Sequence, residues 1–283
     1  MLVPPIEREG RYVFEFGSTR LEVDPRVGAR VVSLSCAGTE LLTGPDVDPL
    51  NYGSTFWPSP QAAWEWPPIE EIDAGPYSGG VSGSSLTLRS EVGTRNGLAI
   101  RVGKRFTPNL QREAIEIEYS IQNAGTVFRQ FAPWEITRVF PNGLTFYPTG
   151  GAPVGNGLPL LATIEAAGHT WFRYASDAIT ANQKLFADGA GGWLAHVGHD
   201  VLLVKTFADT PAAKQAPGEA EIEIYANAAK TYVEVEQQGA YTGLEPGQVM
   251  TWLVTWYVRK LPPTLVPEVG STDLLAFVTK TIE

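Results

Sequence analysis

Apolar residues recur at every second position in short segments along most of the chain. The clearest alternations lie at 113–119, 221–225 and 232–236, where one parity is apolar and the other acidic. A period of two is typical of a β-strand with one buried and one solvated face. Longer runs at 201–207 and 250–258 carry apolar residues at both parities, which suits strands covered on both sides. The pattern predicts an all-β, antiparallel protein in which two sheets pack face to face.

Three stretches depart from this alternation. Residues 44–80, dense in Pro, Trp and Gly, and residues 148–168, rich in Gly, Pro and Ala, are predicted to be long loops, the first ordered by its aromatic residues. Near the end, Ser271 can cap a short helix reaching Lys280, because the apolar residues there follow a period of 3.6. Since no linker or repeat is visible, we expect residues 1–283 to form a single β-sandwich domain.

Charge narrows the choice of partners. The 283 residues carry 31 acidic and 21 basic side chains, a net charge of −10, which repels nucleic acid and anionic membranes, so we expect neither as a partner. The lone Cys36 ends an apolar run and is predicted to be a buried thiol. There is no N-terminal signal pattern and no run of roughly 18–20 apolar residues. We therefore expect a soluble protein, cytoplasmic, or periplasmic or secreted if a signal peptide was removed; its oligomeric state stays open.

Three passages carry a family resemblance. The first runs from Leu21 to Leu34 and is followed by Gly-Thr-Glu-Leu-Leu. The second is a strand ending in the turn Asn-Ala-Gly125, followed by Ala-Pro-Trp-Glu-Ile-Thr-Arg at 132–138. The third and most specific is Val-Glu-Val-Glu-Gln-Gln at 233–238, followed by Leu-Glu-Pro-Gly-Gln. Together they resemble the galactose mutarotase-like proteins of the aldose 1-epimerase superfamily, in a branch with a Trp- and Pro-rich loop.

The resemblance implies a fold and a reaction. The fold is an antiparallel β-supersandwich, here with a short C-terminal helix. In mutarotases a glutamate on a late strand takes the proton of the anomeric hydroxyl, while a histidine protonates the ring oxygen. Glu236 matches that glutamate through its Glu-x-Gln context, but the strand at 133–138, where the family carries its histidine, has none. The resemblance therefore implies Glu236 as the base, with Glu135 or His169 as the acid.

The neighbours of these two glutamates extend the candidate site. Glu135 lies between bulky apolar residues that favour a raised pKa, as a general acid needs; alternatively it pairs with Arg138. Trp134 and Arg138 are expected to contact the substrate, the arginine through a sugar hydroxyl or a uronate carboxylate. Glu234 leaves the strand on the same face as Glu236, about 7 Å away, and belongs either to the site or to a solvated strand face.

The tryptophan-rich loop offers a second set of contacts. Trp64 and Trp66, together with Trp57, can stack on the apolar face of a pyranose, while Gln61, with Glu65 and Glu70, binds its hydroxyl groups. The alternative is a small core that holds the loop in place. The remaining acidic strand segments, 113–118 and 221–223, are interpreted as solvated sheet faces.

Other chemistries find no support in the sequence. His196 and His199 flank a turn without a nearby cysteine or carboxylate group, so we expect no metal site. Gly-Gly-Ala-Pro-Val-Gly at 150–155 lacks the Lys-Ser/Thr ending of a phosphate loop, and no Gly-x-Ser-x-Gly nucleophile turn stands beside a suitable His and Asp. We expect no cofactor.

Three functions follow, all with a monosaccharide, a sugar end or an oligosaccharide as ligand. The first is a 1-epimerase with Glu236 as base. The second is a glycoside hydrolase or lyase using Glu135 and Glu236, which for hydrolysis requires carboxyl groups about 5–5.5 Å apart for retention or roughly 6.5–9.5 Å for inversion. The third is a carbohydrate-binding protein without catalysis, which the missing histidine favours.

Overall fold

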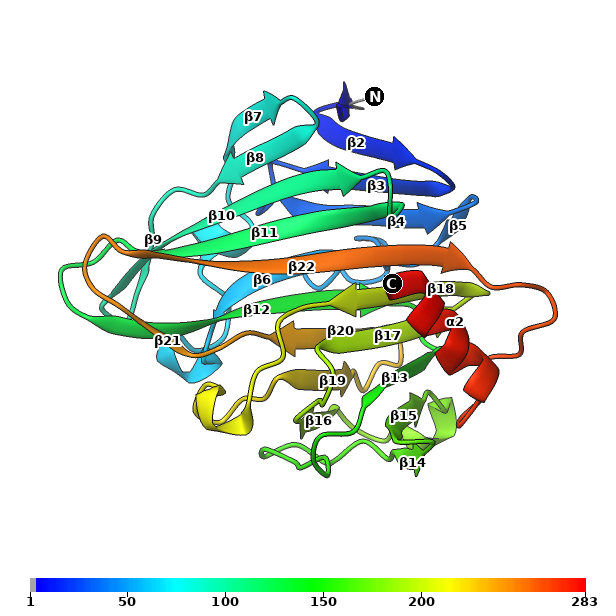
Figure 1. The fold of residues 1–283 in the computed structure, drawn as a ribbon. Helices are drawn as coiled ribbons and strands as arrows, with labels where there is room; N and C mark the ends of the chain where they lie inside the picture. Colours follow the sequence, from blue (N-terminus) through cyan, green and yellow to red (C-terminus); the bar gives the residue numbers. More distant parts are fainter. Residues whose placement is uncertain (1–3) are drawn as a thin grey trace.

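The computed structural model describes residues 4–283, and the N-terminal residues 1–3, included in the prediction about signal peptides, lie outside it. Two large antiparallel sheets of eleven strands each form the body of the described chain (Figure 1). This confirms the prediction of an all-β sandwich with a short C-terminal helix.

The first sheet has the strand order β1-β2-β3-β4-β6-β12-β20-β19-β16, with β5 on β4 and β21 on β12. Its strands are β1 (Ile6–Arg8), β2 (Arg11–Phe16), β3 (Thr19–Asp24), β4 (Arg30–Cys36), β5 (Thr39–Glu40), β6 (Ser54–Ser59), β12 (Arg129–Val139), β16 (Gln183–Ala187), β19 (Ile222–Ala226), β20 (Val233–Gln238) and β21 (Thr242–Leu244).

The second sheet has the order β14-β15-β13-β17-β18-β22-β11-β10-β8-β7, with β9 on β10. Its strands are β7 (Ser78–Ser82), β8 (Ser85–Arg89), β9 (Gly93–Arg95), β10 (Leu98–Asn109), β11 (Ala114–Asn123), β13 (Leu144–Pro148), β14 (Ile164–Ala166), β15 (His169–Arg173), β17 (Trp193–Gly198), β18 (Val201–Thr206) and β22 (Val249–Lys260).

The main hydrophobic core lies between the two sheets. In β11 the residues Ile115, Ile117 and Ile121 are buried there, while Glu116 and Glu118 of the other parity face outward, as the alternation predicts. Each such isoleucine contributes roughly 1.5–3 kcal/mol by leaving water. Cys36 is a buried free thiol, which confirms the prediction for it.

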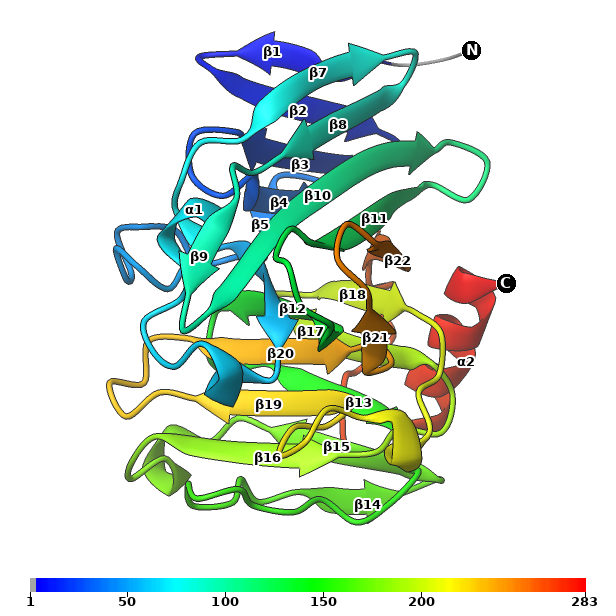
Figure 2. The same ribbon diagram turned by 90° about the vertical axis from the view of Figure 1, so that its left-hand side faces the viewer.

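Helix α2 (Thr272–Ile282) covers part of the outer face of the second sheet, on the side away from the first sheet (Figure 2). Its apolar residues Leu274 and Val278 are buried in a smaller second core with Tyr257 and Leu202. The Ser271 hydroxyl accepts a hydrogen bond from the backbone N–H of Leu274 at 3.2 Å, so the predicted cap is present. No helix within residues 4–283 combines the length and the apolar character needed to cross a bilayer.

The predicted long loops contain more structure than the sequence indicated. Residues 44–80 include the fully buried strand β6 and the short helix α1 (Glu70–Asp73), and the second stretch contains β14. Pro58 and Pro60 obscure the alternation of β6; Pro58 lies opposite Pro133 of β12, where neither residue has an N–H to offer the ladder. Part of the predicted loop, Ser54–Ser59, is therefore a central strand beside β12.

Candidate functional site

A cavity of about 280 Å³ opens on the outer face of the first sheet. Strands β6, β12, β16, β19 and β20 build it, together with the loops at their ends and the segment between β13 and β14. Its lining comprises Asn51, Trp57, Gln61, Trp66, Trp134, Leu158, Asn182, Lys184, Tyr225, Tyr232 and Glu234. Five residues proposed from the sequence, Trp57, Gln61, Trp66, Trp134 and Glu234, therefore meet here.

Strand register explains why these side chains share one face. On β12, Trp134 lies opposite Trp57 of β6, and Arg138 lies opposite Glu234 of β20. Side chains two apart leave a strand on the same face, so residues 134, 136 and 138 all face outward. Across the next pair, Tyr225 of β19 lies opposite Glu234 and extends the same surface.

Aromatic rings form one wall of the cavity. The ring of Trp57 is 5.3 Å from that of Trp134 and 6.0 Å from that of Trp66, in edge-to-face arrangements. Trp66 is 52% exposed, so its ring is accessible to a ligand. Tyr225 and Tyr232, 6.3 Å apart, belong to the same lining. Such rings present flat apolar faces together with polar edges.

Behind this wall lies a buried group of charged residues centred on Lys184. Its ammonium is 2.6 Å from a carboxylate oxygen of Glu223 and 3.2 Å from Glu236. The indole N–H of Trp134 donates to Glu236 at 2.8 Å, and the Lys184 ammonium lies 5.0 Å from the centre of the Trp134 ring. Glu236 itself is fully buried and does not line the cavity, but it contacts two residues that do, Trp134 and Lys184.

Burial dominates the protonation of these groups. It raises the pKa of Glu236 to about 8 and that of Glu223 to about 7, although the Lys184 ammonium opposes both shifts. Burial alone would lower the pKa of Lys184, but the carboxylates beside it raise this pKa well above its ordinary value. Near neutral pH the group therefore holds a charged lysine and two carboxyl groups close to their titration points.

Hydrogen bonds attach this cluster to the surrounding chain. Gln238 donates its side-chain N–H to Glu223 at 2.7 Å, and the backbone N–H of Ala220 donates to the same oxygen at 3.0 Å. The Glu219 carboxylate accepts from the backbone N–H of Gln61 at 2.9 Å, which joins the tryptophan-rich loop to the segment before β19. The interpretation of residues 221–223 as a solvated face is wrong, because Glu221 and Glu223 are fully buried.

Arg138 supports the site from below instead of binding a ligand directly. Its Nε donates to Glu234 at 2.8 Å and its Nη1 to Thr55 at 2.9 Å, and the side chain is fully buried. Its guanidinium lies 5.4 Å from the ring centre of Trp57. Arg138 therefore pairs with the carboxylate of Glu234 where the sequence predicted the carboxylate of a uronate ligand, and Glu234 in turn lines the cavity.

Glu135 lies on the opposite face of β12, inside the core between the sheets. It accepts hydrogen bonds from Tyr119 at 2.5 Å and Trp256 at 3.1 Å, and its carboxylate is 2.9 Å from the Lys205 ammonium. The expected pairing with Arg138 and the acid role beside Glu236 do not fit this placement. Alternation is the reason: Glu135 is one residue from Trp134 and so must face the other way.

His169 and Trp64 also lie away from the cavity. His169 is on β15 of the second sheet, where its ring packs 5.4 Å from Trp193 and Nδ1 lies 2.7 Å from the carbonyl oxygen of Ala167. Trp64 is buried, and its indole N–H donates to the carbonyl oxygen of Pro58 at 2.7 Å. The core interpretation therefore fits Trp64, and the ligand-facing interpretation fits Trp66.

Several lining residues were not singled out from the sequence: Asn51, Leu158, Asn182, Lys184, Tyr225 and Tyr232. One signal in the sequence could have indicated Lys184. Glu221, Glu223 and Tyr225 alternate along the chain and so share one strand face, and buried carboxylates on such a face need a cation nearby. Which cation supplies that charge depends on β16 pairing with β19, which places Lys184 opposite Tyr225.

The two-sheet architecture is shared with galactose mutarotase-like proteins. The Slr1438 protein from Synechocystis is 14% identical, with a TM-score of 0.61 over 92% of this chain and 99% of its own. A putative aldose 1-epimerase from Escherichia coli is 12% identical, with a TM-score of 0.60 over 89% and 99%. A galactose mutarotase related enzyme from Lactobacillus acidophilus is 10% identical, with a TM-score of 0.60 over 91% and 100%.

These likenesses define the class of fold, a galactose mutarotase-like β-sandwich, as the sequence resemblance implied. Residues 22–259 match the family model described as a domain of unknown function, DUF4380. The chain belongs to that family. No curated protein matches its sequence.

Proposed function

We propose that the cavity on the first sheet binds one ring of a monosaccharide or of a sugar end. The observation that carries this proposal is the lining itself, in which Trp57, Trp66 and Trp134 stand beside the polar side chains of Gln61 and Asn182. A sugar ring has apolar C–H faces and a rim of hydroxyl groups, and this lining complements both. The volume of about 280 Å³ lies just below the roughly 300–1,000 Å³ of sites for drug-sized ligands, which suits a single ring.

Charge pairing favours a neutral sugar. Two cations lie at or beneath the cavity, and both already have carboxylate partners: Lys184 has Glu223 and Glu236, and Arg138 has Glu234. A phosphate or uronate group would have to compete with these buried ion pairs and would meet the Glu234 carboxylate at close range. Hydroxyl groups can instead share donors and acceptors with the lining without displacing a charge.

Binding is tested by calorimetric titration with aldoses, uronic acids and short neutral oligosaccharides. Trp66→Ala should weaken the binding of the preferred sugar by about tenfold, the loss expected for one aromatic contact of roughly 1–1.5 kcal/mol. Phe128→Ala is the matched control, because Phe128 is 51% exposed and lies outside the cavity. Equal affinity in both variants, or no binding of any sugar by the wild type, would overturn the proposal.

A second candidate function, 1-epimerisation, rests on the position and pKa of Glu236. The reaction removes a proton from the anomeric hydroxyl and delivers one to the ring oxygen, which suits groups that titrate near neutral pH. Glu236, with a pKa of about 8, lies directly behind Lys184, a residue that lines the cavity and whose ammonium pairs with this carboxylate. We infer that ionised Glu236 would take a proton from Lys184 as Lys184 takes the proton of the anomeric hydroxyl, and that the reverse transfer would deliver this proton to the ring oxygen.

Proton NMR of freshly dissolved sugars tests this candidate by following the anomeric signals over time. Faster approach to equilibrium than in buffer supports an epimerase, and Glu236→Gln should then abolish it. Glu116→Gln is the control, since Glu116 is a half-buried carboxylate on the outer face of the second sheet, away from the cavity. Loss of activity in both variants would contradict the role of Glu236. New reducing-end or unsaturated signals would indicate hydrolysis or elimination, and binding without conversion would leave a carbohydrate-binding protein.

A further inference from the structure

A second hollow lies on the outer face of the second sheet, on the opposite side of the sandwich from the sugar cavity. It has a volume of about 340 Å³ and adjoins a smaller depression of about 90 Å³. Strands β7, β8, β10, β11 and β22 form its floor. The lining comprises Ser82, Ser85, Thr87, Arg89, Arg101, Gly103, Lys104, Arg105, Glu118, Ser120, Gln122, Val249 and Thr251.

The hollow exists because a glycine occupies the middle of an outward-facing row. Along β10, Arg101, Gly103 and Arg105 share one face, since they are spaced by two residues. Gly103 lies opposite Arg89 of β8 on one side and Ser120 of β11 on the other. A Cβ atom at position 103 would lie 2.4 Å from the Ser120 Oγ. The missing side chain therefore leaves a recess in an otherwise continuous layer of side chains.

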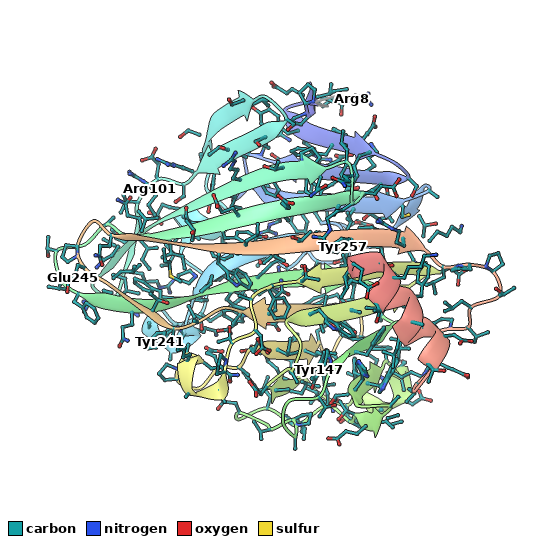
Figure 3. All side chains as sticks on the ribbon, viewed as in Figure 1. Arg8, Arg101, Tyr147, Tyr241, Glu245 and Tyr257 are labelled. Carbon is teal, nitrogen blue, oxygen red and sulfur yellow. The ribbon has the colours of Figure 1, made fainter. Side chains whose placement is uncertain are left out.

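Three arginines border this recess without an acidic partner. Within residues 4–283, Arg89, Arg101 and Arg105 form no ion pair within 4.0 Å and no side-chain hydrogen bond, whereas Arg26 and Arg138 are both held by carboxylates. Figure 3 labels Arg101 on β10. In a chain with a net charge of −10, three adjacent unpaired guanidinium groups form a local positive field that attracts anions.

The remaining lining indicates what kind of anion fits. Hydroxyl groups of Ser85, Thr87, Ser120 and Thr251 surround the recess, and Val249, which is more than half exposed, provides an apolar patch at its edge. Guanidinium groups bind carboxylate and sulfate oxygens in a bidentate manner, while hydroxyl groups exchange hydrogen bonds with other hydroxyl groups. Glu118 is the one acidic residue in the lining; it faces Arg105 across the β10–β11 ladder and sets one side of the site.

We propose that this arginine-lined recess is a second binding site, which takes the carboxylate or sulfate group of an acidic saccharide. The anionic group lies over Gly103 between Arg89, Arg101 and Arg105, and the adjoining sugar hydroxyls meet the serine and threonine side chains. The site differs from the cavity on the first sheet in its charge as well as its position, because the cations there are paired and these are not. The two sites therefore select neutral and acidic sugar units respectively.

The test is a titration of the full chain with short oligogalacturonate, with its fully methyl-esterified form, with a sulfated oligosaccharide and with inorganic sulfate. Binding of the acidic oligosaccharide should exceed that of the neutral ester at least tenfold and should weaken as salt is added. Preference for the sulfated ligand would assign the sulfate as the recognised group. Equal binding of acid and ester, or equally tight binding of inorganic sulfate alone, would overturn the proposal of a saccharide site.

Variants separate the recess from general surface charge. Arg101→Gln and Arg105→Gln should each weaken binding about 5- to 10-fold, the loss expected for a charge-assisted hydrogen bond on a partly exposed surface. Arg8→Gln is the charge-matched control, an exposed arginine on β1 that Figure 3 also labels. Gly103→Val fills the recess without changing the charge and should abolish binding.

Retained binding in Gly103→Val, or equal losses in the arginine variants and in Arg8→Gln, would show that the oligosaccharide responds to the general surface charge of the protein and not to the recess. Should Gly103→Val fail to fold, Ser120→Leu fills the same recess from the neighbouring strand and should abolish binding in the same way. Tighter binding of an acidic peptide than of any saccharide would also overturn the proposal.

Discussion

Replacing Glu236 with glutamine tests the electrostatics of the cavity without requiring any knowledge of the ligand. Gln preserves the size of the side chain and can still accept the hydrogen bond from the Trp134 indole, but it cannot ionise. In the wild type, burial raises the pKa of Glu236 from 4.5 to about 8. The folded protein therefore keeps a proton that the unfolded chain has already released between these two pH values.

The sign of the effect follows from this difference in bound protons. A raised carboxyl pKa stabilises the folded state fully below about pH 4.5, and this stabilisation is lost as the pH rises to about 8. At about 1.36 kcal/mol per pKa unit, the upper limit is on the order of 5 kcal/mol. The protonation of Glu236 is coupled to the charges of Lys184 and Glu223, which reduces the effect of removing Glu236 alone. We therefore expect the free energies of unfolding of the wild type and Glu236→Gln to differ by about 2 kcal/mol.

Urea unfolding at pH 5 and pH 9, followed by the fluorescence of the eight tryptophans, measures the difference. The two proteins should have similar free energies of unfolding at pH 5, and Glu236→Gln should be the more stable at pH 9. A difference that does not change with pH would refute the raised pKa. A wild type that gains stability over the variant as the pH rises would show that Glu236 is an ordinary ionised partner of Lys184.

Three further predictions concern the scaffold. Lys205→Met removes the cation beside the buried Glu135 and should lower the free energy of unfolding by about 3 kcal/mol at pH 8, measured in urea; a change below about 1 kcal/mol would contradict the importance of the pair. Ser271→Ala removes the α2 cap and should cost about 1 kcal/mol locally, seen as faster hydrogen exchange in that helix alone. Gly28→Ala should destabilise by about 2 kcal/mol or more, by thermal unfolding, because φ is +68° and a Cβ would lie 2.1 Å from the Asp73 carbonyl oxygen.

Local patterns were sufficient to predict the class of fold. Period-two alternation depends only on which residues are neighbours in the chain, so strands such as β11 and β20 could be placed from it. The same rule also placed Glu234 and Glu236 on one face. It failed at β6, because the prolines there break the pattern that reveals a strand.

The candidate site was predicted only in part, and Glu135 shows one reason. The rule of alternation separates Glu135 from both Trp134 and Arg138, so grouping all three in one site contradicted the pattern already present in the sequence. Lys184 shows a different reason. Its place opposite Tyr225 depends on which strands pair across some forty residues, and no local pattern encodes that choice.

The buried contact between Glu135 and Lys205 also controls how insertions and deletions in β12 would be tolerated. If β12 slipped by one residue, Glu135 would rotate out of the core, Trp134 would rotate into it, and the Lys205 ammonium would lose its counter-charge in the interior. The pair therefore stabilises only one register of β12 against its neighbouring strands. Sequence change can then reshape the loops around the cavity freely, while the five strands beneath it keep a fixed alignment.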